Sequence, residues 1–169
     1  MAEARKRRVM AVGVFDLVHL GHVHYLQEAR AMGDELVVVV ATDEMVRKRK
    51  HVPIFPQEMR VEMVAALKPV DLAIVGDPRD QLASVERLRP DVIALGYDDY
   101  HKVEELRKAL ASRGLHPEIR RVTKFDHDLD GTRKIIRRIF DSGLFTPSTE
   151  KALEKPFDPG APPAGGVRP

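Results

Sequence analysis

The chain has 169 residues, enough for one domain with its own hydrophobic core and too few for two comfortable ones. Lysine and arginine number 28 against 26 acidic residues, so the net charge of +2 is too small to bind nucleic acid through overall charge. The absence of cysteine excludes a disulfide framework, a thiolate nucleophile and a cysteine-based zinc site in this chain. With no apolar run of about 20 residues and no signal-peptide pattern, we expect a cytoplasmic protein without membrane spans.

Short apolar runs alternate with segments of helical periodicity. The runs predict strands over residues 9–14, 36–41, 72–75, 92–95 and 119–122. Helices are predicted over residues 21–32, 43–50, 56–67, 80–88, 102–113 and 132–141. Because the second and fourth runs do not alternate with polar residues, their strands are expected to be buried on both faces. The expected fold class is α/β, with a doubly wound, parallel, five-stranded sheet between helix layers.

Glycine and proline suggest where elements and domains end. Gly33 and Gly114 follow two predicted helices, where a C′ glycine commonly ends a helix. Six of the twelve prolines fall in residues 147–169. We therefore predict a basic extension over residues 1–7, one domain over 8–145 and a poorly ordered Pro/Gly-rich tail over 146–169. A tail that straps across the domain or a partner subunit is the alternative.

A turn rich in glycine and histidine, GVFDLVHLGH at residues 13–22, joins the first predicted strand to the first predicted helix. A helix N-terminus has unpaired N–H groups and partial positive charge, so this turn predicts a phosphate site. His19 and His22 add two imidazoles, and Gly21 allows close approach of the backbone to a ligand. The alternative is half of a metal site, but zinc needs three or four ligands and the chain has no HExxH pattern.

This turn resembles the GTFDxxHxGH signature of the cytidylyltransferase-like nucleotidyltransferases. The resemblance continues through residues 36–43, 53–64, 67–73 and 89–98, which are most similar to the archaeal FAD synthetase branch. It implies a Rossmann-like fold, transfer of AMP from ATP to FMN to give FAD and pyrophosphate, Mg²⁺ as the divalent metal, and a homodimer. The alternatives are a CTP-dependent cytidylyltransferase acting on glycerol phosphate or a similar phosphorylated alcohol, and a non-catalytic nucleotide-binding module. No nucleic-acid or membrane partner is expected.

The same resemblance implies roles for individual residues. His19, His22 and Lys48 are the expected catalytic residues, with Lys48 reaching the phosphates from a flexible basic loop over residues 47–51 and Lys50 as its competitor. The expected nucleotide-binding residues are Val14, Phe15, His19, Leu20, Gly21, His22, Asp98, Phe125, Thr132 and Arg133. The expected acceptor-binding or phosphate-binding residues are Asp16, Asp43 and Arg60. No side chain is assigned as a metal ligand.

Several of these residues also have ordinary structural interpretations, which stay open at this point. Asp16 fits a turn at the edge of the core, and Asp43 fits a helix start with acidic residues in its first turn. Arg60 lies at the edge of an apolar helix face, where a surface arginine could also lie. The sequence departs from the family at Gly131 and Arg133, where serine or threonine is usual, so Thr132 is the remaining hydroxyl there and Arg133 could supply a charge-assisted contact instead.

Overall fold

The computed structural model describes residues 5–49, 52–98 and 103–143. Strands and helices alternate along the chain in the order β1 (Arg8–Gly13), α1 (Leu20–Arg30), β2 (Glu35–Val40), α2 (Asp43–Arg49), α3 (Gln57–Ala65), β3 (Leu72–Val75), α4 (Ala83–Leu88), β4 (Val92–Leu95), α5 (Val103–Ala111), β5 (Glu118–Arg121) and α6 (Thr132–Asp141). The chain divides into two compact units, Met1–Thr132 and Arg133–Pro169. The whole sheet belongs to the first unit, and the tail predicted over residues 146–169 lies outside the described residues.

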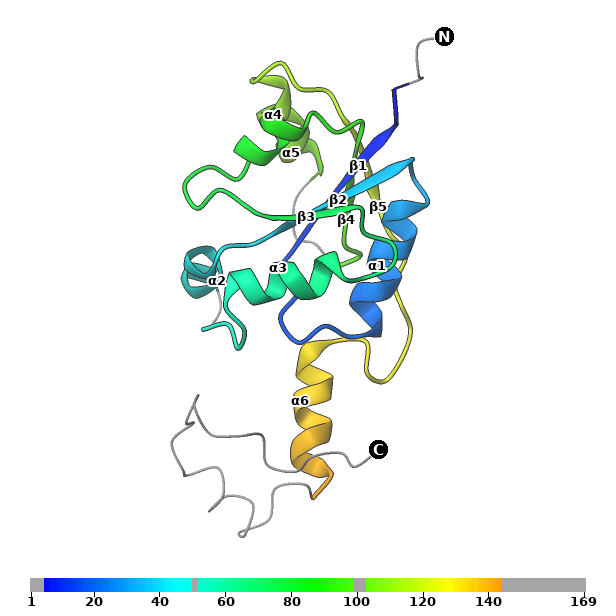
Figure 1. Ribbon diagram of the computed structural model, residues 1–169, viewed down its shortest axis with the longest axis vertical. Coiled ribbons are helices and arrows are strands. Elements are labelled where there is room, and N and C mark those ends of the chain that lie inside the picture. Colours follow the sequence, from blue (N-terminus) through cyan, green and yellow to red (C-terminus); the bar gives the residue numbers. More distant parts are fainter. Residues whose placement is uncertain (1–4, 50–51, 99–102, 144–169) are drawn as a thin grey trace. The chain divides into compact units, whose positions relative to one another are not determined.

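The five strands form one parallel sheet in the order β3-β2-β1-β4-β5 (Figure 1). The chain winds outward from β1 to β3 and then returns to the other side of β1 to form β4 and β5. This confirms the predicted doubly wound, Rossmann-like α/β fold. In such a sheet ligands bind beyond the carboxyl ends of the strands at the point where the winding reverses, which here lies between β1 and β4.

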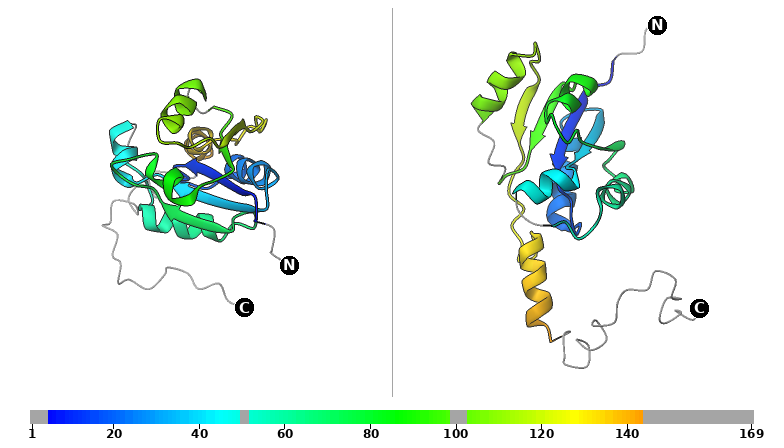
Figure 2. Two further views of the ribbon diagram at one scale, coloured as in Figure 1. Left: turned by 90° about the horizontal axis from the view of Figure 1, so that it is seen from above. Right: turned by 90° about the vertical axis from the view of Figure 1, so that its left-hand side faces the viewer.

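Two hydrophobic clusters lie on opposite faces of the sheet, because successive strand residues point to opposite sides. Val9 and Ala11 of β1 belong to the cluster that α1 and α3 cover. Met10, between them, belongs to the cluster that α4 and α5 cover. Figure 2 shows the helices on both sides of the strands. Since β2 and β4 contribute to both clusters, the prediction that these strands are buried on both faces is confirmed.

Some predicted boundaries shift. The expected helix over residues 80–88 starts at Ala83, because the Asp80 carboxylate accepts a hydrogen bond from the Leu82 N–H and holds the chain in a turn. Gly114 has a φ of +68° beyond α5, as predicted. The prediction for Gly33 was wrong, since α1 already ends at a right-handed Ala31 and Gly33 is not among the left-handed glycines of the described residues. Gly33 instead lies against the Arg7 carbonyl, which a Cβ would approach to 2.6 Å.

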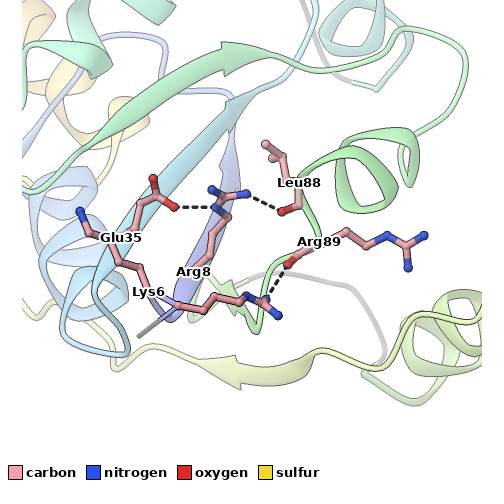
Figure 3. Close-up of a pocket in the computed structure, with 6 residues that line it drawn as sticks. Lys6, Arg8, Glu35, Leu88 and Arg89 are labelled. Atoms are coloured by element: carbon pink, nitrogen blue, oxygen red, sulfur yellow. Dashed lines mark hydrogen bonds and ion pairs between the residues drawn. The ribbon is translucent and has the colours of Figure 1, made fainter. Parts of the chain in front are cut away.

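At the amino edge of the sheet, the basic residues after the N-terminus are held by acidic partners. Arg8 forms an ion pair with Glu35 at 2.6 Å and donates a hydrogen bond to the Leu88 carbonyl (Figure 3). These three residues line a cavity of about 240 Å³. Arg5 pairs with Asp91 at 2.9 Å, and Arg7 pairs with Glu118 at 2.6 Å. This edge is opposite to the one where the glycine-histidine turn lies. Among the described residues, no helix is long and apolar enough to cross a membrane.

Candidate active site

The loop between β1 and α1 follows a strained path. Phe15 and Leu17 have φ values of +54° and +52°, in the left-handed region that residues with a Cβ rarely adopt. Such conformations cost about 1–3 kcal/mol each and cluster at functional sites. Gly13 makes room for the turn, because a Cβ there would lie 2.7 Å from the Phe15 ring. The chain thereby passes from the carboxyl end of β1 into α1 within a few residues.

The Phe15 side chain belongs to the hydrophobic core. It is 1% exposed and packs in the cluster that α1 and α3 cover. Its ring centroid lies 5.2 Å from that of His22 and 6.2 Å from that of Tyr25. The Phe15 side chain therefore supports the His22 ring, which leaves only the Phe15 backbone for contact with a ligand, and the expected binding of nucleotide by Phe15 stays a prediction.

His19 and His22 form a stacked pair at the N-terminus of α1. Their ring centroids are 3.8 Å apart, with 23° between the ring planes. His19 is the N-cap residue, and a spacing of three places His22 on the same side of the helix. Among the described residues, the buried side-chain nitrogens without a hydrogen-bond partner are Nδ1 of His19 and Nδ1 of His22. A buried polar atom without a partner costs free energy, so the fold holds this pair in place at a cost to stability.

Burial lowers the pKa of both imidazoles. At His19, desolvation outweighs the opposing effect of the Asp130 charge on the pKa. At His22, desolvation and the neighbouring His19 lower the pKa to about 3, against a smaller opposing effect of Asp16. Both rings are therefore neutral at pH 7, and each offers one N–H donor. A bound phosphate chain would raise both pKa values, because an opposite charge favours the protonated ring.

Gly21 is required by a close contact within the protein. A Cβ at this position would lie 2.3 Å from the Asp130 carbonyl oxygen and 3.0 Å from the His19 ring. The sequence suggested that Gly21 gives space to a ligand, but in the structure the segment before Thr132 occupies that space. Gly21 therefore brings the loop that ends at Thr132 against the start of α1.

Asp16 fixes two other segments to the turn. Its carboxylate is 6% exposed and accepts hydrogen bonds from the backbone N–H groups of Ile54 at 2.8 Å and Phe55 at 3.0 Å. Its carbonyl accepts a hydrogen bond from the Thr132 hydroxyl at 3.2 Å. The turn interpretation of Asp16 agrees with these contacts. They also bring Thr132 to the histidine turn, where the sequence predicted it.

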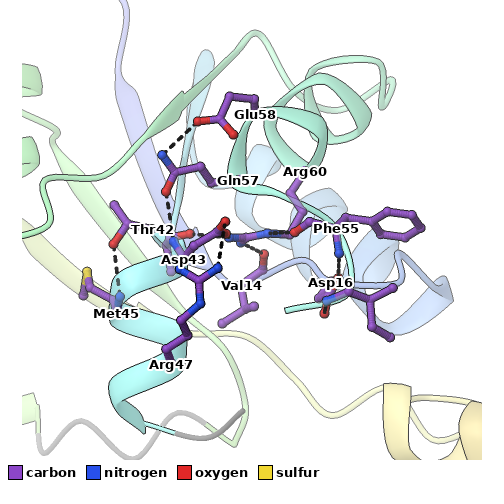
Figure 4. Close-up of polar contacts among 12 residues, drawn as sticks. Val14, Asp16, Thr42, Asp43, Met45, Arg47, Phe55, Gln57, Glu58 and Arg60 are labelled. Atoms are coloured by element: carbon purple, nitrogen blue, oxygen red, sulfur yellow. Dashed lines mark hydrogen bonds and ion pairs between the residues drawn. The ribbon is translucent and has the colours of Figure 1, made fainter. Parts of the chain in front are cut away.

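Arg60 is fully buried and binds four groups of the protein (Figure 4). Its guanidinium donates to the carbonyls of Val14 at 2.5 Å, Ala41 at 2.9 Å and Phe55 at 3.0 Å. It also donates to the Asp43 carboxylate at 2.7 Å. Arg60 and Asp43 therefore hold the turn, the end of β2 and the start of α3 together, and their expected contact with phosphate or acceptor stays a prediction.

The predicted flexible basic loop is partly helical. Arg47, Lys48 and Arg49 lie in α2, while Lys50 and His51 lie outside the described residues. Lys48 is 67% exposed at its side chain and forms an i,i+4 ion pair with Glu44 at 2.6 Å. An exposed pair of this kind contributes about 0–1 kcal/mol, so the lysine is readily released to another partner. Its predicted catalytic role stays a prediction.

The remaining predicted residues differ in exposure and in the part of the chain that carries them. Leu20, the first residue of α1, is 60% exposed, and Asp98 is exposed just after β4. Phe125 is half-buried and its ring lies 5.2 Å from His24 and 5.8 Å from His127, a cluster that no sequence motif indicated. Arg133 belongs to the second compact unit. Its role, like those of Asp98 and Phe125, stays a prediction.

A cavity of about 400 Å³ lies at the carboxyl ends of β2 and β3, on the same edge of the sheet as the histidine turn. Its lining includes Thr42, Asp43, Arg47, Gln57 and Glu58. The Thr42 hydroxyl accepts a hydrogen bond from the Met45 N–H and caps α2, while the Gln57 amide oxygen accepts one from the Asp43 N–H. Sequence reasoning missed Gln57 and Glu58 as lining residues, because polar residues in a first helical turn have an ordinary structural explanation.

The described residues contain no group of three or more histidine, aspartate or glutamate side chains that could hold a metal ion. Mg²⁺ commonly binds through one or two carboxylates together with substrate phosphates and water. The carboxylates whose charges act on the histidine pair are Asp16, which acts on His22, and Asp130, which acts on His19. Mg²⁺ as the divalent metal of this site stays a prediction.

Comparison with known proteins places this chain in a family. Residues 10–150 match the cytidylyltransferase-like family. The curated FAD synthase of Aciduliprofundum boonei is 50% identical over 135 residues, which are 79% of this chain and 91% of that protein. The FAD synthase of Thermoplasma acidophilum is 45% identical over 134 residues, covering 79% of this chain and 94% of that protein.

A solved structure has the same fold. The crystal structure of a Thermoplasma volcanium protein, described as a lipopolysaccharide core biosynthesis protein, matches with a TM-score of 0.71 and 44% identity. The match covers 72% of this chain and 100% of that one. The strand order and the sequence of the histidine turn agree with these similarities. The chain belongs to the cytidylyltransferase-like family.

Proposed function

We propose that this protein is an FMN adenylyltransferase, which transfers AMP from ATP to FMN and releases pyrophosphate. The observation that carries the proposal is its similarity to FAD synthases, 45% and 50% identical over more than nine-tenths of their length. It is supported by the His19–His22 pair, whose buried, unpartnered Nδ1 atoms lie at the start of a helix. The protein is thus a nucleotidyltransferase.

The reaction needs positioning and hydrogen bonds more than acid–base groups. An oxygen of the FMN phosphate forms a bond to the α-phosphorus of ATP, and the bond from that phosphorus to the β-phosphate oxygen breaks. The second pKa of a phosphate monoester is about 6, so the attacking phosphate is ionised at pH 7 and needs no general base. Negative charge spreads over the phosphoryl oxygens as the bond breaks. Neutral imidazole N–H groups aimed at those oxygens stabilise that charge.

The other assignments belong to the same proposal. Backbone groups of Val14, Leu20 and Gly21 surround the phosphates, with Lys48 reaching them from α2. Asp98 binds the ribose, Phe125 lines the base pocket, and Thr132 and Arg133 bind the phosphates. A divalent ion such as Mg²⁺, bound with the ATP phosphates, would neutralise part of their charge, and two copies of the chain form a homodimer.

Pyrophosphate release from every pairing of ATP or CTP with FMN or glycerol 3-phosphate tests this function. We expect release with ATP and FMN, accompanied by FAD. His22→Ala, with folding confirmed, is the negative control and should lower turnover by at least about a hundredfold, the usual effect of losing one transition-state donor. Release only with CTP and glycerol 3-phosphate would identify the alternative reaction. Tight nucleotide binding without release from any pairing would identify a binding module.

A further inference from the structure

Two large apolar side chains are exposed in the segment that precedes α3. Val52 is 68% exposed and Ile54 is 56% exposed, while Pro53 between them is buried. Single exposed apolar residues are common on protein surfaces and need no explanation. These two differ because the backbone that carries them is fixed.

Buried charged groups hold this backbone. The Asp16 carboxylate accepts hydrogen bonds from the N–H groups of Ile54 and Phe55, and the Arg60 guanidinium donates one to the Phe55 carbonyl. Asp16 is 6% exposed and Arg60 is 0% exposed, so water competes little for these contacts. Pro53 restricts the backbone further by fixing its φ. The protein itself therefore holds the backbone of this segment at Ile54 and Phe55.

The same two charged groups attach the segment to the loop that carries the histidine pair. Asp16 lies in that loop and its charge acts on the pKa of His22. Arg60 donates a hydrogen bond to the Val14 carbonyl in the same loop. Val52 and Ile54 therefore lie in a segment attached to the loop between β1 and α1, which carries the histidine pair. A substrate with an apolar surface that binds at this loop would cover them.

We propose that Val52 and Ile54 contact the isoalloxazine ring of FMN and make the site selective for a flavin acceptor. This inference rests on the proposed function. An isoalloxazine is a large planar ring with an apolar benzenoid edge, so it gains from contact with aliphatic side chains. A polyol phosphate carries hydroxyl groups over its length and gains nothing from that contact. The apolar pair therefore favours FMN over a polyol phosphate. Residues that bind only the phosphate group cannot make this distinction, because both acceptors carry one.

The test compares Ile54→Ser and Val52→Ser with Leu72→Ser. Leu72 is the first residue of the outermost strand β3 and is 46% exposed. It lies at the amino ends of the strands, whereas the histidine pair lies at their carboxyl ends, so it serves as the matched control. FMN binding is measured by the change in flavin fluorescence, and the KM values for FMN and ATP by pyrophosphate release. We expect each of the first two variants to raise the Kd and KM for FMN about tenfold, or about 1.4 kcal/mol. The KM for ATP, the melting temperature and all values of Leu72→Ser should stay within about twofold or 2 °C of the parent.

Each other outcome is decisive. Unchanged FMN affinity in both variants of the apolar pair, in a parent that forms FAD, overturns the inference and leaves the proposed function intact. A parent that neither binds FMN nor forms FAD refutes the proposed function itself. Equal losses for ATP and FMN would mean that the segment acts through the catalytic loop, which also contradicts direct contact. Ile54→Leu should retain FMN binding, because it keeps the apolar surface.

Discussion

Replacing Arg60 with methionine should destabilise the protein severely although no ligand is involved. The substitution keeps an apolar chain of similar length but leaves the carbonyls of Val14, Ala41 and Phe55 and the Asp43 carboxylate without this donor. A buried acceptor left unsatisfied costs about 1–3 kcal/mol. Removing one partner of a buried ion pair costs about 3–5 kcal/mol. The Asp43 side chain is 20% exposed and Arg47 lies 3.9 Å away, which reduces the second penalty.

The lower ends of these ranges, about 1 kcal/mol for each of the three carbonyls and a reduced cost for the ion pair, imply that Arg60→Met lowers the free energy of unfolding by at least about 4 kcal/mol, a large part of the usual 5–15 kcal/mol. Urea unfolding and thermal melting measure this, with an expected fall in Tm of roughly 10–15 °C for a chain of this size. Arg60→Lys keeps the charge and some of the donors, so about half of that loss is expected and a folded variant is available. Arg107→Met is the matched control, because Arg107 is 56% exposed at its side chain and pairs with Glu104 on the surface.

The outcome also separates two roles for Arg60. A loss below about 1 kcal/mol in Arg60→Met would refute the calculation, since surface ion pairs alone account for that much. Unchanged stability together with a raised KM for ATP would restore the phosphate-binding role that the sequence suggested. A loss of stability in Arg60→Lys with a near-normal KM for ATP would support a purely positioning role.

Two further predictions concern the turn itself. Because the folded pKa of His22 is about 3, below the ordinary 6.5 expected in the unfolded chain, its contribution to stability is complete above about pH 6.5 and is lost as pH falls toward 3. As pH falls across this window, the unfolding free energy of the parent should therefore drop more steeply than that of His22→Asn, by about 1.4 kcal/mol per pH unit. Equal slopes of unfolding free energy against pH in the two proteins would contradict a neutral His22 ring in the folded state. Gly21→Ala would be stabilising by about 1 kcal/mol at an ordinary helix position. In this protein Gly21→Ala should instead lower the free energy of unfolding by about 1–3 kcal/mol and displace His19, because the new Cβ meets the Asp130 carbonyl. Gly131→Ala is the control and should not destabilise the protein, because the space around Gly131 is open. A higher Tm for Gly21→Ala would refute the close contact.

Parts of the site could be found from the chain order alone. The histidine turn follows the first strand and starts the first helix, and strand ends in a parallel sheet meet at one edge. This places His19, Asp43 and Asp98 on the same edge without any knowledge of contacts. The resemblance of residues 13–22 to a family signature then supplied the expected reaction.

Other roles could not be read from the sequence because the groups involved leave no pattern in it. Arg60 binds three backbone carbonyls, and any residue can provide a carbonyl. Gly21 is required by the carbonyl of the distant Asp130 rather than by a ligand. The Asp16 carboxylate accepts hydrogen bonds from the backbone N–H groups of Ile54 and Phe55. Like the carbonyls, these backbone groups do not depend on the type of side chain.

The sequence by itself determined the α/β class, the strand positions and the location of the histidine turn. Apolar periodicity and turn residues are local properties, and the right-handed winding of parallel strands limits how such elements combine. The tertiary structure alone showed that Asp16 and Arg60 hold distant segments together, and that the His19 and His22 rings are stacked with their Nδ1 atoms buried. Those properties depend on desolvation and on backbone partners far apart in the chain, and both arise only when the segments pack together.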